Sequence, residues 1–350
     1  MATHLLAAHR AAGATLAEYE GCTLPESFAT LAQEWSAGKE RVAVFDTSWH
    51  ATFRVGGRDR VNYLHAITSG NIKELEPGRG TLALLLNPQG HILSELEVYV
   101  LAENVLVRTH AAARERTLAT LRKFIIGSDV KIEDLSDAEG SMGVEGPRAA
   151  AAIEQACGAK LEEMAAMSMR EVAVDGTPCK LIRRSHFGAP GAELLAGSKE
   201  LPQLWTALLQ AAAAQGGEAI GMAALNALRL EARVPWYPAD FNEAMIPHEA
   251  GVEATHISFN KGCYTGQEIV ERVRSRGHVN RKRVALRFST ASPPAAGTKL
   301  RANGAEIGFI SSAAAMPDAR AAIGMGYVRK EQFAPGSTVE FDGGTATVAS

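Results

Sequence analysis

The densest group of chemically active side chains lies at residues 259–268, which read Phe-Asn-Lys-Gly-Cys-Tyr-Thr-Gly-Gln-Glu. Gly262 and Gly266 allow the backbone there to adopt unusual dihedral angles or to approach a ligand closely. Cys263 stands close to Lys261 and just before a predicted helix, and a nearby cation and a helix N-terminus both stabilise a thiolate. The segment therefore predicts a reactive thiol or soft ligand at Cys263. The alternative is an inert cysteine buried in a glycine-rich turn.

The other cysteines add no metal site. They are scattered, with no C-x-x-C pair and no histidine at metal-ligand spacing, and one cysteine cannot hold an iron–sulfur cluster by itself. A disulfide framework is not expected, and a reducing compartment fits better. His9 and Arg10 interrupt the apolar N-terminal run, so we expect neither a signal peptide nor a membrane span, and we infer a cytoplasmic protein. The four cysteines are Cys22, Cys157, Cys179 and Cys263.

Composition indicates a soluble, folded chain of two or three domains. It has 350 residues, 46% of them hydrophobic and 21% charged, and a formal net charge of −3. No global basic field exists to hold nucleic acid, so we do not expect it as a partner. A local basic run between Arg272 and Arg283 could attract tRNA or another acidic partner. A solvated linker is favoured, because no stacking aromatic residues interleave the run.

The expected elements divide the chain into three regions. Residues 1–40 are rich in Ala, Leu and Glu and are predicted to be helical. Residues 41–276 alternate short strands with helices, often as hairpins, which favours an α+β region of two subdomains with antiparallel sheets. Residues 277–350 show only short strands separated by turn residues, which is typical of a small β-barrel.

The segment KGCYTGQE resembles the signature of the YgfZ-type folate-binding proteins, which belong to the superfamily of the glycine-cleavage T-protein, an aminomethyltransferase. The resemblance implies a ring-like α+β body of three subdomains around a central folate site, with a small C-terminal β-barrel. It spans roughly residues 12 to 330. Four further blocks resemble superfamily motifs in the same order: VFDTSWH at 44–50, LNPQGHILSEL at 86–96, LRLEARVPWYPAD at 228–240 and PHEAG at 247–251.

The resemblance implies tetrahydrofolate, or another reduced folate, as the cofactor. Glu193 matches the carboxylate that binds the pterin, whose amino group and ring N–H form a donor pair for two carboxylate oxygens; a solvent-exposed glutamate at a strand edge is the alternative. Arg229 matches an arginine close to folate, where a cation would suit the anionic glutamyl tail. The alternative for Arg229 is a surface salt bridge with Glu231 or Glu218.

Aromatic residues near these positions could form the walls of the site. Trp49 replaces a histidine of the superfamily pattern, and Tyr237, beside Trp236, could offer a flat face to a pterin or benzoyl ring. Packing of a proline-rich turn is the alternative for Trp236 and Tyr237. We expect Lys261, Cys263, Tyr264, Gln267 and Glu268 to form the rest of the functional surface.

One departure from the superfamily affects the expected reaction. T-proteins carry two adjacent aspartates in the hairpin at 86–96, one of them catalytic, whereas this chain has Ser94 and Glu95. Glu95 could still carry the negative charge, although its side chain is one methylene longer and displacement by about 1 Å is costly for positioned chemistry. An outward-facing strand residue is the alternative for Glu95.

We therefore expect a tetrahydrofolate-binding accessory protein that supports assembly or repair of iron–sulfur enzymes. Its partners would be iron–sulfur client or assembly proteins, with Cys263 and Lys261 as the reactive groups. The alternative is a folate-dependent aminomethyltransferase or demethylase that uses Glu95, so whether the protein is an enzyme stays open. A binding module for tRNA or a protein, without folate, is a third hypothesis.

Overall fold

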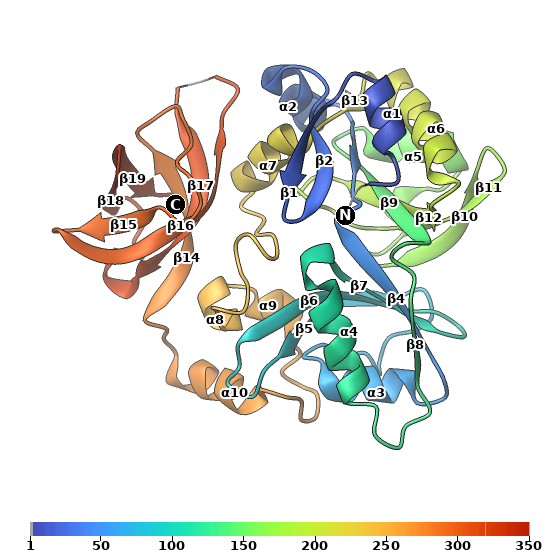
Figure 1. Ribbon diagram of the computed structural model, residues 1–350, viewed down its shortest axis with the longest axis horizontal. Coiled ribbons are helices and arrows are strands. Elements are labelled where there is room, and N and C mark those ends of the chain that lie inside the picture. Colours follow the sequence, from blue (N-terminus) through green and yellow to red (C-terminus); the bar gives the residue numbers. More distant parts are fainter. Residues whose placement is uncertain (1–2, 319, 350) are drawn as a thin grey trace.

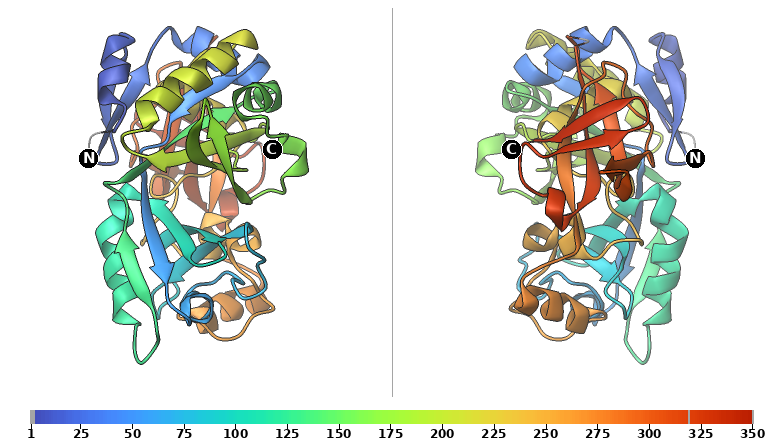
Figure 2. Two further views of the ribbon diagram at one scale, coloured as in Figure 1. Left: turned by 90° about the vertical axis from the view of Figure 1, so that its right-hand side faces the viewer. Right: turned by 90° about the vertical axis from the view of Figure 1, so that its left-hand side faces the viewer.

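The computed structural model describes residues 3–318 and 320–349. Two sheet-containing parts and a barrel surround a common centre, with the six-stranded sheet above, the five-stranded sheet below and the barrel to one side (Figure 1). The right-hand view of Figure 2 places the barrel in front of the other two parts. This confirms the predicted α+β body of sheets and helices with a C-terminal barrel. Within the described residues, no helix is both long and apolar enough to span a bilayer.

The N-terminal segment is not helical throughout, so that part of the prediction for residues 1–40 is wrong; residues 1 and 2 lie outside the described chain. Glu20 and Gly21 both have positive φ angles, of 48° and 81°, as a tight hairpin turn requires, and the strands on either side of them pair. The elements of the N-terminal segment are α1 (Leu6–Ala11), β1 (Thr15–Tyr19), β2 (Cys22–Ser27) and α2 (Leu31–Glu40).

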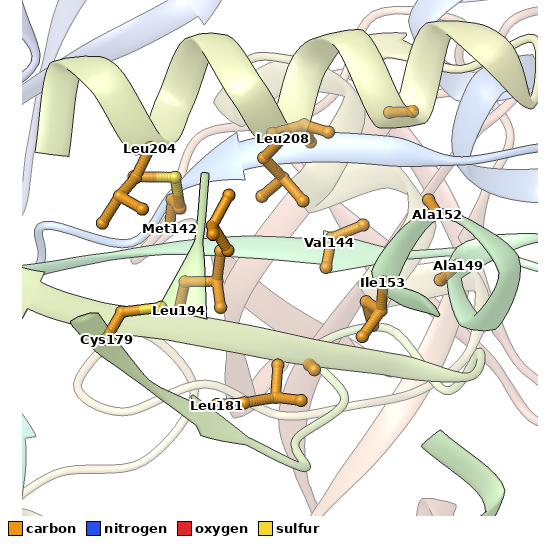
Figure 3. Packing of buried hydrophobic residues seen from close by; sticks show 14 of the residues in the cluster. Met142, Val144, Ala149, Ala152, Ile153, Cys179, Leu181, Leu194, Leu204 and Leu208 are labelled. Atoms are coloured by element: carbon orange, nitrogen blue, oxygen red, sulfur yellow. The ribbon is translucent and has the colours of Figure 1, made fainter. Parts of the chain in front are cut away.

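A six-stranded sheet forms the upper part, in the order β10-β11-β12-β9-β3-β13. Its strands are antiparallel except that β13 pairs with β3 in parallel. Apolar residues of α6 recur at helical spacing and pack on the sheet: Figure 3 shows Leu204 and Leu208 above Met142 and Val144. The elements are β3 (Ala43–Asp46), β9 (Glu139–Glu145), α5 (Ala149–Cys157), η2 (Leu161–Glu163), β10 (Met169–Val174), β11 (Thr177–Ile182), β12 (Gly191–Gly197), α6 (Leu201–Ala214) and β13 (Glu218–Ala219).

A five-stranded antiparallel sheet forms the lower part, in the order β5-β6-β7-β4-β8. The predicted hairpin turn at residues 87–90 is confirmed. There the Asn87 side-chain oxygen accepts hydrogen bonds from the backbone N–H groups of Gln89 and His91, at 3.0 and 2.9 Å. The elements are β4 (His50–Gly56), α3 (Arg60–Ile67), β5 (Gly80–Leu86), β6 (Ile92–Val100), β7 (Val105–His110), η1 (Ala111–Ala113), α4 (Arg114–Lys123) and β8 (Lys131–Asp134).

Four helices connect these sheets to the barrel. The helix predicted from Gly266 to Arg274 is α10, and Gly266, with a φ of 82°, precedes its first residue. A Cβ at Gly266 would meet the Asn87 carbonyl oxygen at 2.6 Å, so glycine is required where this loop crosses the hairpin turn. The helices are α7 (Met222–Glu231), α8 (Pro247–Ala250), α9 (Glu253–His256) and α10 (Gln267–Arg276).

The C-terminal region is a closed barrel of six strands, in the order β14-β17-β16-β15-β18-β19. The domain boundary predicted at residue 277 falls between the end of α10 and the start of the barrel. The Asp240 carboxylate of the body accepts hydrogen bonds from Ser311 and Ser312 of the barrel. The elements are β14 (Arg281–Phe288), β15 (Lys299–Ala302), β16 (Ala305–Ala315), β17 (Ala322–Arg329), η3 (Lys330–Gln332), β18 (Thr338–Phe341) and β19 (Gly344–Val348).

Candidate functional site

A pocket, here called the central pocket, opens between the two sheets of the body. The space inside it that admits a water-sized molecule is about 40 Å³, so side chains fill most of it. Its walls come from the tip of the β1–β2 hairpin, from β4, β6 and β7, from the loop after β11, and from the segment after α7. The lining residues are Tyr19, Glu20, Trp49, His50, Glu95, Glu97, Arg108, Thr109, His110, Arg184, His186 and 235–239.

The floor of the central pocket is a buried network of charges centred on Arg108. Glu97 and Arg108 face each other on the neighbouring strands β6 and β7, and Nη1 of Arg108 donates to Glu97 at 3.0 Å. Nη2 of the same guanidinium donates to Glu193, on the other sheet, at 2.7 Å. Arg184 donates to the second oxygen of Glu97 at 2.8 Å. One guanidinium therefore joins the two sheets beneath the pocket.

These contacts determine the charge states of the floor. Burial disfavours the ionised form of Glu97, but Arg184 and Arg108 outweigh it and lower the pKa of Glu97 to about 2. Arg108 likewise holds the pKa of Glu193 well below its usual value. Burial, assisted by Arg108, lowers the pKa of His50 to about 3, so this imidazole is neutral at pH 7.

Three of these side chains have the composition of a metal site. His50, Glu97 and Glu193 place their ligand atoms within 4.8 Å of one another. Arg108, however, contacts both carboxylates, so a metal ion would have to displace a guanidinium that already neutralises them. The arrangement supports a structural ion network more than a metal centre.

The side chain of Glu193 is fully buried, so the alternative of a solvent-exposed strand-edge glutamate is wrong. Its carboxylate accepts hydrogen bonds from Arg108 and from Thr47, the latter at 3.1 Å, and lies 2.9 Å from Nε2 of His186. Glu193 does not line the central pocket, whereas Arg108 and His186 do. A role of Glu193 in binding a ligand stays a prediction, and in this arrangement it acts through those two neighbours.

Glu95 lines the central pocket, with 21% of its side chain exposed. The alternative of an outward-facing strand residue is therefore wrong. Nε2 of His256 lies 2.8 Å from one carboxylate oxygen, and Nδ1 of His256 faces the Thr255 hydroxyl at 2.7 Å. The preceding residue, Ser94, points to the opposite side of β6 and bonds Thr117 at 2.6 Å. Strand alternation thus directs Glu95, and not Ser94, toward the pocket.

An aromatic wall faces these charges. The indole rings of Trp49 and Trp236 lie 5.4 Å apart at 32°, and both line the central pocket. Tyr237 also lines it, while its hydroxyl donates to the Leu93 carbonyl at 2.9 Å and accepts from Arg116 at 2.9 Å. The structure therefore brings Trp49 and Tyr237 to the same pocket as Glu95.

Arg229 lies beneath this wall rather than in the pocket. It is fully buried and ion-paired with Asp240, and its guanidinium carbon lies 5.0 Å from the centroid of a Trp236 ring. The suggested surface salt bridges to Glu231 or Glu218 are wrong, because those residues pair with Lys39 and Arg41. Arg229 is also not placed to reach an anionic ligand, so its expected role beside folate is not supported by the geometry.

The motif 259–268 lies outside the central pocket. Lys261, Cys263, Tyr264 and Gln267 are all absent from the pocket lining. Cys263 is exposed, so the alternative of a buried cysteine is wrong, and its reactivity stays a prediction. Burial lowers the pKa of Lys261 to about 8, and its ammonium donates to the backbone carbonyls of His65 and Thr68.

The two remaining motif residues support the loop rather than the pocket. Tyr264 packs into the core beneath the β5–β6 hairpin, and Lys261 lies 5.1 Å from the centroid of its ring. Gln267 is half-buried at the first position of α10. The motif therefore presents one exposed thiol on a loop that is anchored from behind.

Sequence reasoning did not identify Glu97, Arg108, His50 or His256 as parts of the site. The available signal was a charged residue inside otherwise apolar strands, as in Leu96-Glu97-Val98 and Val107-Arg108-Thr109. Such residues are rarely buried without a partner. Two opposite charges in neighbouring strands could have suggested the pair, although not its link to Glu193.

Comparisons with known proteins cover almost the whole chain. The family of the GCVT N-terminal domain matches residues 5–261, and that of the glycine cleavage T-protein C-terminal barrel domain matches residues 281–349. An aminomethyltransferase of Streptomyces coelicolor is 30% identical over 341 residues, which are 96% of this chain and 91% of that protein. An aminomethyltransferase of Geobacillus kaustophilus is 27% identical over 342 residues, 97% of this chain and 93% of that protein.

A solved structure shows the same fold. The glycine cleavage system aminomethyltransferase T of Bartonella henselae superposes with a TM-score of 0.89 at 24% identity. The match covers 100% of this chain and 97% of that one.

Proposed function

Because the chain belongs to the glycine-cleavage T-protein family, whose aminomethyltransferases use tetrahydrofolate, we propose that it binds a reduced folate in the central pocket and takes part in folate-dependent transfer of a one-carbon unit. The proposal depends above all on Glu95, whose carboxylate faces the pocket and is held by His256 at 2.8 Å. In the superfamily that the sequence resembles, the hairpin that matches residues 86–96 carries the catalytic aspartate.

The side chains that line the central pocket are of the kinds that bind a reduced folate, but its space of about 40 Å³ is too small for that ligand, so binding requires the walls to move apart. The faces of Trp49 and Trp236 match a flat ring system. Glu95 has one carboxylate oxygen with no hydrogen-bond partner among the described residues, and it can accept from an N–H group. Arg184, with 21% of its side chain exposed, is the guanidinium that the pocket offers to an anionic group. Glu193 does not fit a direct contact while Arg108 and His186 occupy it.

Each protein group has a defined part in this proposal. Tetrahydrofolate, when bound, supplies the nitrogen that accepts the one-carbon unit. The carboxylate of Glu95 stabilises the positive charge that develops during transfer, and preorganised groups of this kind are the largest usual contribution to catalysis. His256 fixes the direction of that carboxylate, and the indole wall excludes water from one side.

The test of the transferase proposal uses the full chain, tetrahydrofolate and an aminomethylated lipoyl carrier protein. Methylene-tetrahydrofolate and ammonia are expected in equal amounts, with loss of both in Glu95→Gln. Calorimetry with tetrahydrofolate tests binding separately. If tetrahydrofolate does not bind the wild type, the folate proposal is wrong; if it binds without turnover, the transferase proposal alone is wrong.

A second candidate function rests on a different observation, the exposed thiol of Cys263. The segment around it resembles the YgfZ-type signature, and Ser94, where the T-protein pattern has an aspartate, bonds Thr117 of α4. These two features favour a folate-binding accessory protein that supports iron–sulfur enzymes. Its partners would be the client or assembly proteins that meet the loop, and four free cysteines support the reducing cytoplasm as its location.

Complementation tests this second candidate. In cells that lack the native gene, Cys263→Ser should fail to restore the activity of an iron–sulfur enzyme, whereas Cys157→Ser should restore it. Full restoration by Cys263→Ser would show that the thiol is not the functional group. Failure of complementation together with intact tetrahydrofolate binding would favour the accessory role over the transferase.

A further inference from the structure

A second pocket lies where the carboxyl end of α10 faces the barrel. The space inside it that admits a water-sized molecule is about 570 Å³, and none of its lining residues also lines the central pocket. Its walls come from α8, α9 and the loop that follows, from the last turn of α10, from the connection to β14, and from η3. Figure 1 shows α10 and the connection to β14 below the barrel.

The sides of this α10 pocket are apolar. Four half-buried side chains line it, Phe259, Val273, Val279 and Phe333. Phe259 packs at the edge of the core beneath the β5–β6 hairpin, and Phe333 packs at the edge of the barrel core. The core beneath the β5–β6 hairpin and the core of the barrel therefore both reach this pocket. At each of them an apolar side chain is only partly covered by other described residues.

The rim of the α10 pocket is positively charged. The guanidinium carbon of Arg274 lies 4.2 Å from the centroid of the Phe259 ring, which makes a flat, cationic wall. Lys282 and Lys330 are exposed, and neither forms an ion pair with any described residue. Glu253 is the one acidic residue among the described residues of the lining. Arg274 is paired with Glu271 at 3.5 Å, so Lys282 and Lys330 are the cations of the rim that attract an anion.

Two residues of the lining carry polar atoms without hydrogen-bond partners among the described residues. Both ring nitrogens of His248 and one carboxylate oxygen of Glu253 are shielded from solvent and have no hydrogen-bond partner among the described residues. Burial lowers the pKa of His248, and the neutral ring offers one donor and one acceptor. Buried polar groups in native proteins nearly always have partners, so these atoms point to a polar group supplied by a ligand.

From these contacts we propose that the α10 pocket binds a small anion that carries a flat, nitrogen-containing ring, the chemistry of a nucleotide. The ring lies between the Phe259–Arg274 wall and Phe333. The anionic group contacts Lys282 and Lys330, and polar atoms of the ring pair with His248 and Glu253. This site is independent of folate binding in the central pocket.

The first experiment uses 8-anilinonaphthalene-1-sulfonate, a fluorescent anion with flat rings, and the full chain. The variant Lys282→Glu/Lys330→Glu reverses the charge at the pocket, and Lys160→Glu/Lys199→Glu makes the same change of net charge at exposed lysines elsewhere. We expect the dissociation constant for the probe to rise about tenfold in the first variant and to stay within about twofold in the second. Equal effects in both variants would overturn the proposal.

Competition identifies the chemistry of the ligand. AMP and GMP are expected to displace the probe, whereas inorganic phosphate and uncharged adenosine at the same concentrations are not. Displacement by phosphate alone would show an adventitious ion only and would overturn the proposed ring site. Saturating tetrahydrofolate should leave the probe bound; displacement by tetrahydrofolate would place the probe in the central pocket and also count against the proposal.

A third variant keeps the test independent of charge. Phe333→Ala shortens the apolar wall at a half-buried position and should weaken the probe and AMP in parallel, by several-fold. Thermal unfolding of each variant verifies that the chain is folded. A folded Phe333→Ala protein with unchanged affinity for both molecules would exclude the α10 pocket as their site.

Discussion

The guanidinium of Arg108 and the carboxylate of Glu193 come from different sheets and meet 2.7 Å apart, with neither side chain exposed to solvent. Glu97 contacts the same guanidinium from the neighbouring strand of the lower sheet. The floor of the central pocket is therefore also the junction between the two halves of the body. Substitutions there should affect stability before they affect binding.

Arg108→Met removes the cation and leaves two buried carboxylates facing each other. We expect the free energy of unfolding to fall by about 3–5 kcal/mol, the cost of breaking a buried ion pair from one side. Urea unfolding of the purified variant measures it. Arg54→Met, which breaks an exposed pair with Glu133, is the matched control and should cost less than about 1 kcal/mol. A loss of that small size in Arg108→Met would contradict the structural role of the network.

Asp240→Asn should loosen the junction between body and barrel. The carboxylate neutralises the buried Arg229 and accepts hydrogen bonds from Ser311 and Ser312, so its loss leaves a buried cation without a counter-ion. A destabilisation of about 3–5 kcal/mol is expected in urea. Asp342→Asn, at an exposed position of the barrel, should change stability by less than about 1 kcal/mol. Similar values for both variants would refute this assignment.

Glu95→Gln keeps the size of the side chain and removes its charge. If the transferase proposal holds, formation of methylene-tetrahydrofolate should fall at least about 100-fold, in line with the loss of a preorganised charge. Stability should change little, because the residue is partly exposed, and tetrahydrofolate affinity should change little, because the amide oxygen of glutamine can accept the same N–H group. Glu103→Gln, in the exposed turn before β7, is the control. Full activity in Glu95→Gln would remove Glu95 from the mechanism.

Acid should destabilise the protein, because two buried histidines bind protons only after unfolding. Burial lowers the pKa of His110 to about 4, and burial with Arg108 lowers that of His50 to about 3. The unfolded chain takes up these protons near pH 6.5, so stability is present above that pH and declines as the pH falls toward 3–4. Between pH 7 and pH 5 the loss should be about 2 kcal/mol per histidine.

His110→Asn tests this relationship, since an asparagine oxygen can replace the ring nitrogen that accepts from Ala112. Urea unfolding at several pH values should give about half of the wild-type decline. Glu97, with a pKa of about 2, adds a further loss of the same sign below about pH 4.5. An unchanged pH dependence in His110→Asn would exclude this histidine as a source.

Cys263 should be the first cysteine to react with iodoacetamide under native conditions. It is exposed, whereas burial raises the pKa of Cys179 to about 11 and also raises the pKa values of Cys22 and Cys157. Intact-mass measurements at pH 8 should show one rapid adduct, formed about tenfold faster than the next. Cys263→Ser should lack it, and persistence of the rapid adduct in that variant would contradict the assignment.

The order of the motifs in the sequence predicted the local structure around several site residues correctly. Glu193 does lie on a strand, β12, and Glu95 does follow a hairpin turn. What the sequence could not supply were contacts between distant segments. Arg108 and Glu193 are separated by 85 positions, and no local pattern joins them. The same limit explains why the sequence could not show that residues 259–268 lie outside the lining of the central pocket.

Local structure was predicted best where backbone requirements are strong. Gly266 and the amphipathic residues after it marked the start of α10 within one residue. The β1–β2 hairpin was missed because the Ala- and Leu-rich composition of the first 40 residues resembles helix. The pair Glu20-Gly21 was the available turn signal, and its positive φ angles confirm its role.

The two carboxylate oxygens of Asp240 have different partners. One accepts hydrogen bonds from Ser311 and Ser312 of the barrel, and the other pairs with Arg229. Arg229 in turn lies under the indole of Trp236, whose backbone N–H donates to the same carboxylate at 3.0 Å. Asp240 thereby connects the serines of the barrel with an aromatic side chain of the central pocket. The tryptophan emission of this protein should consequently report the seating of its C-terminal domain.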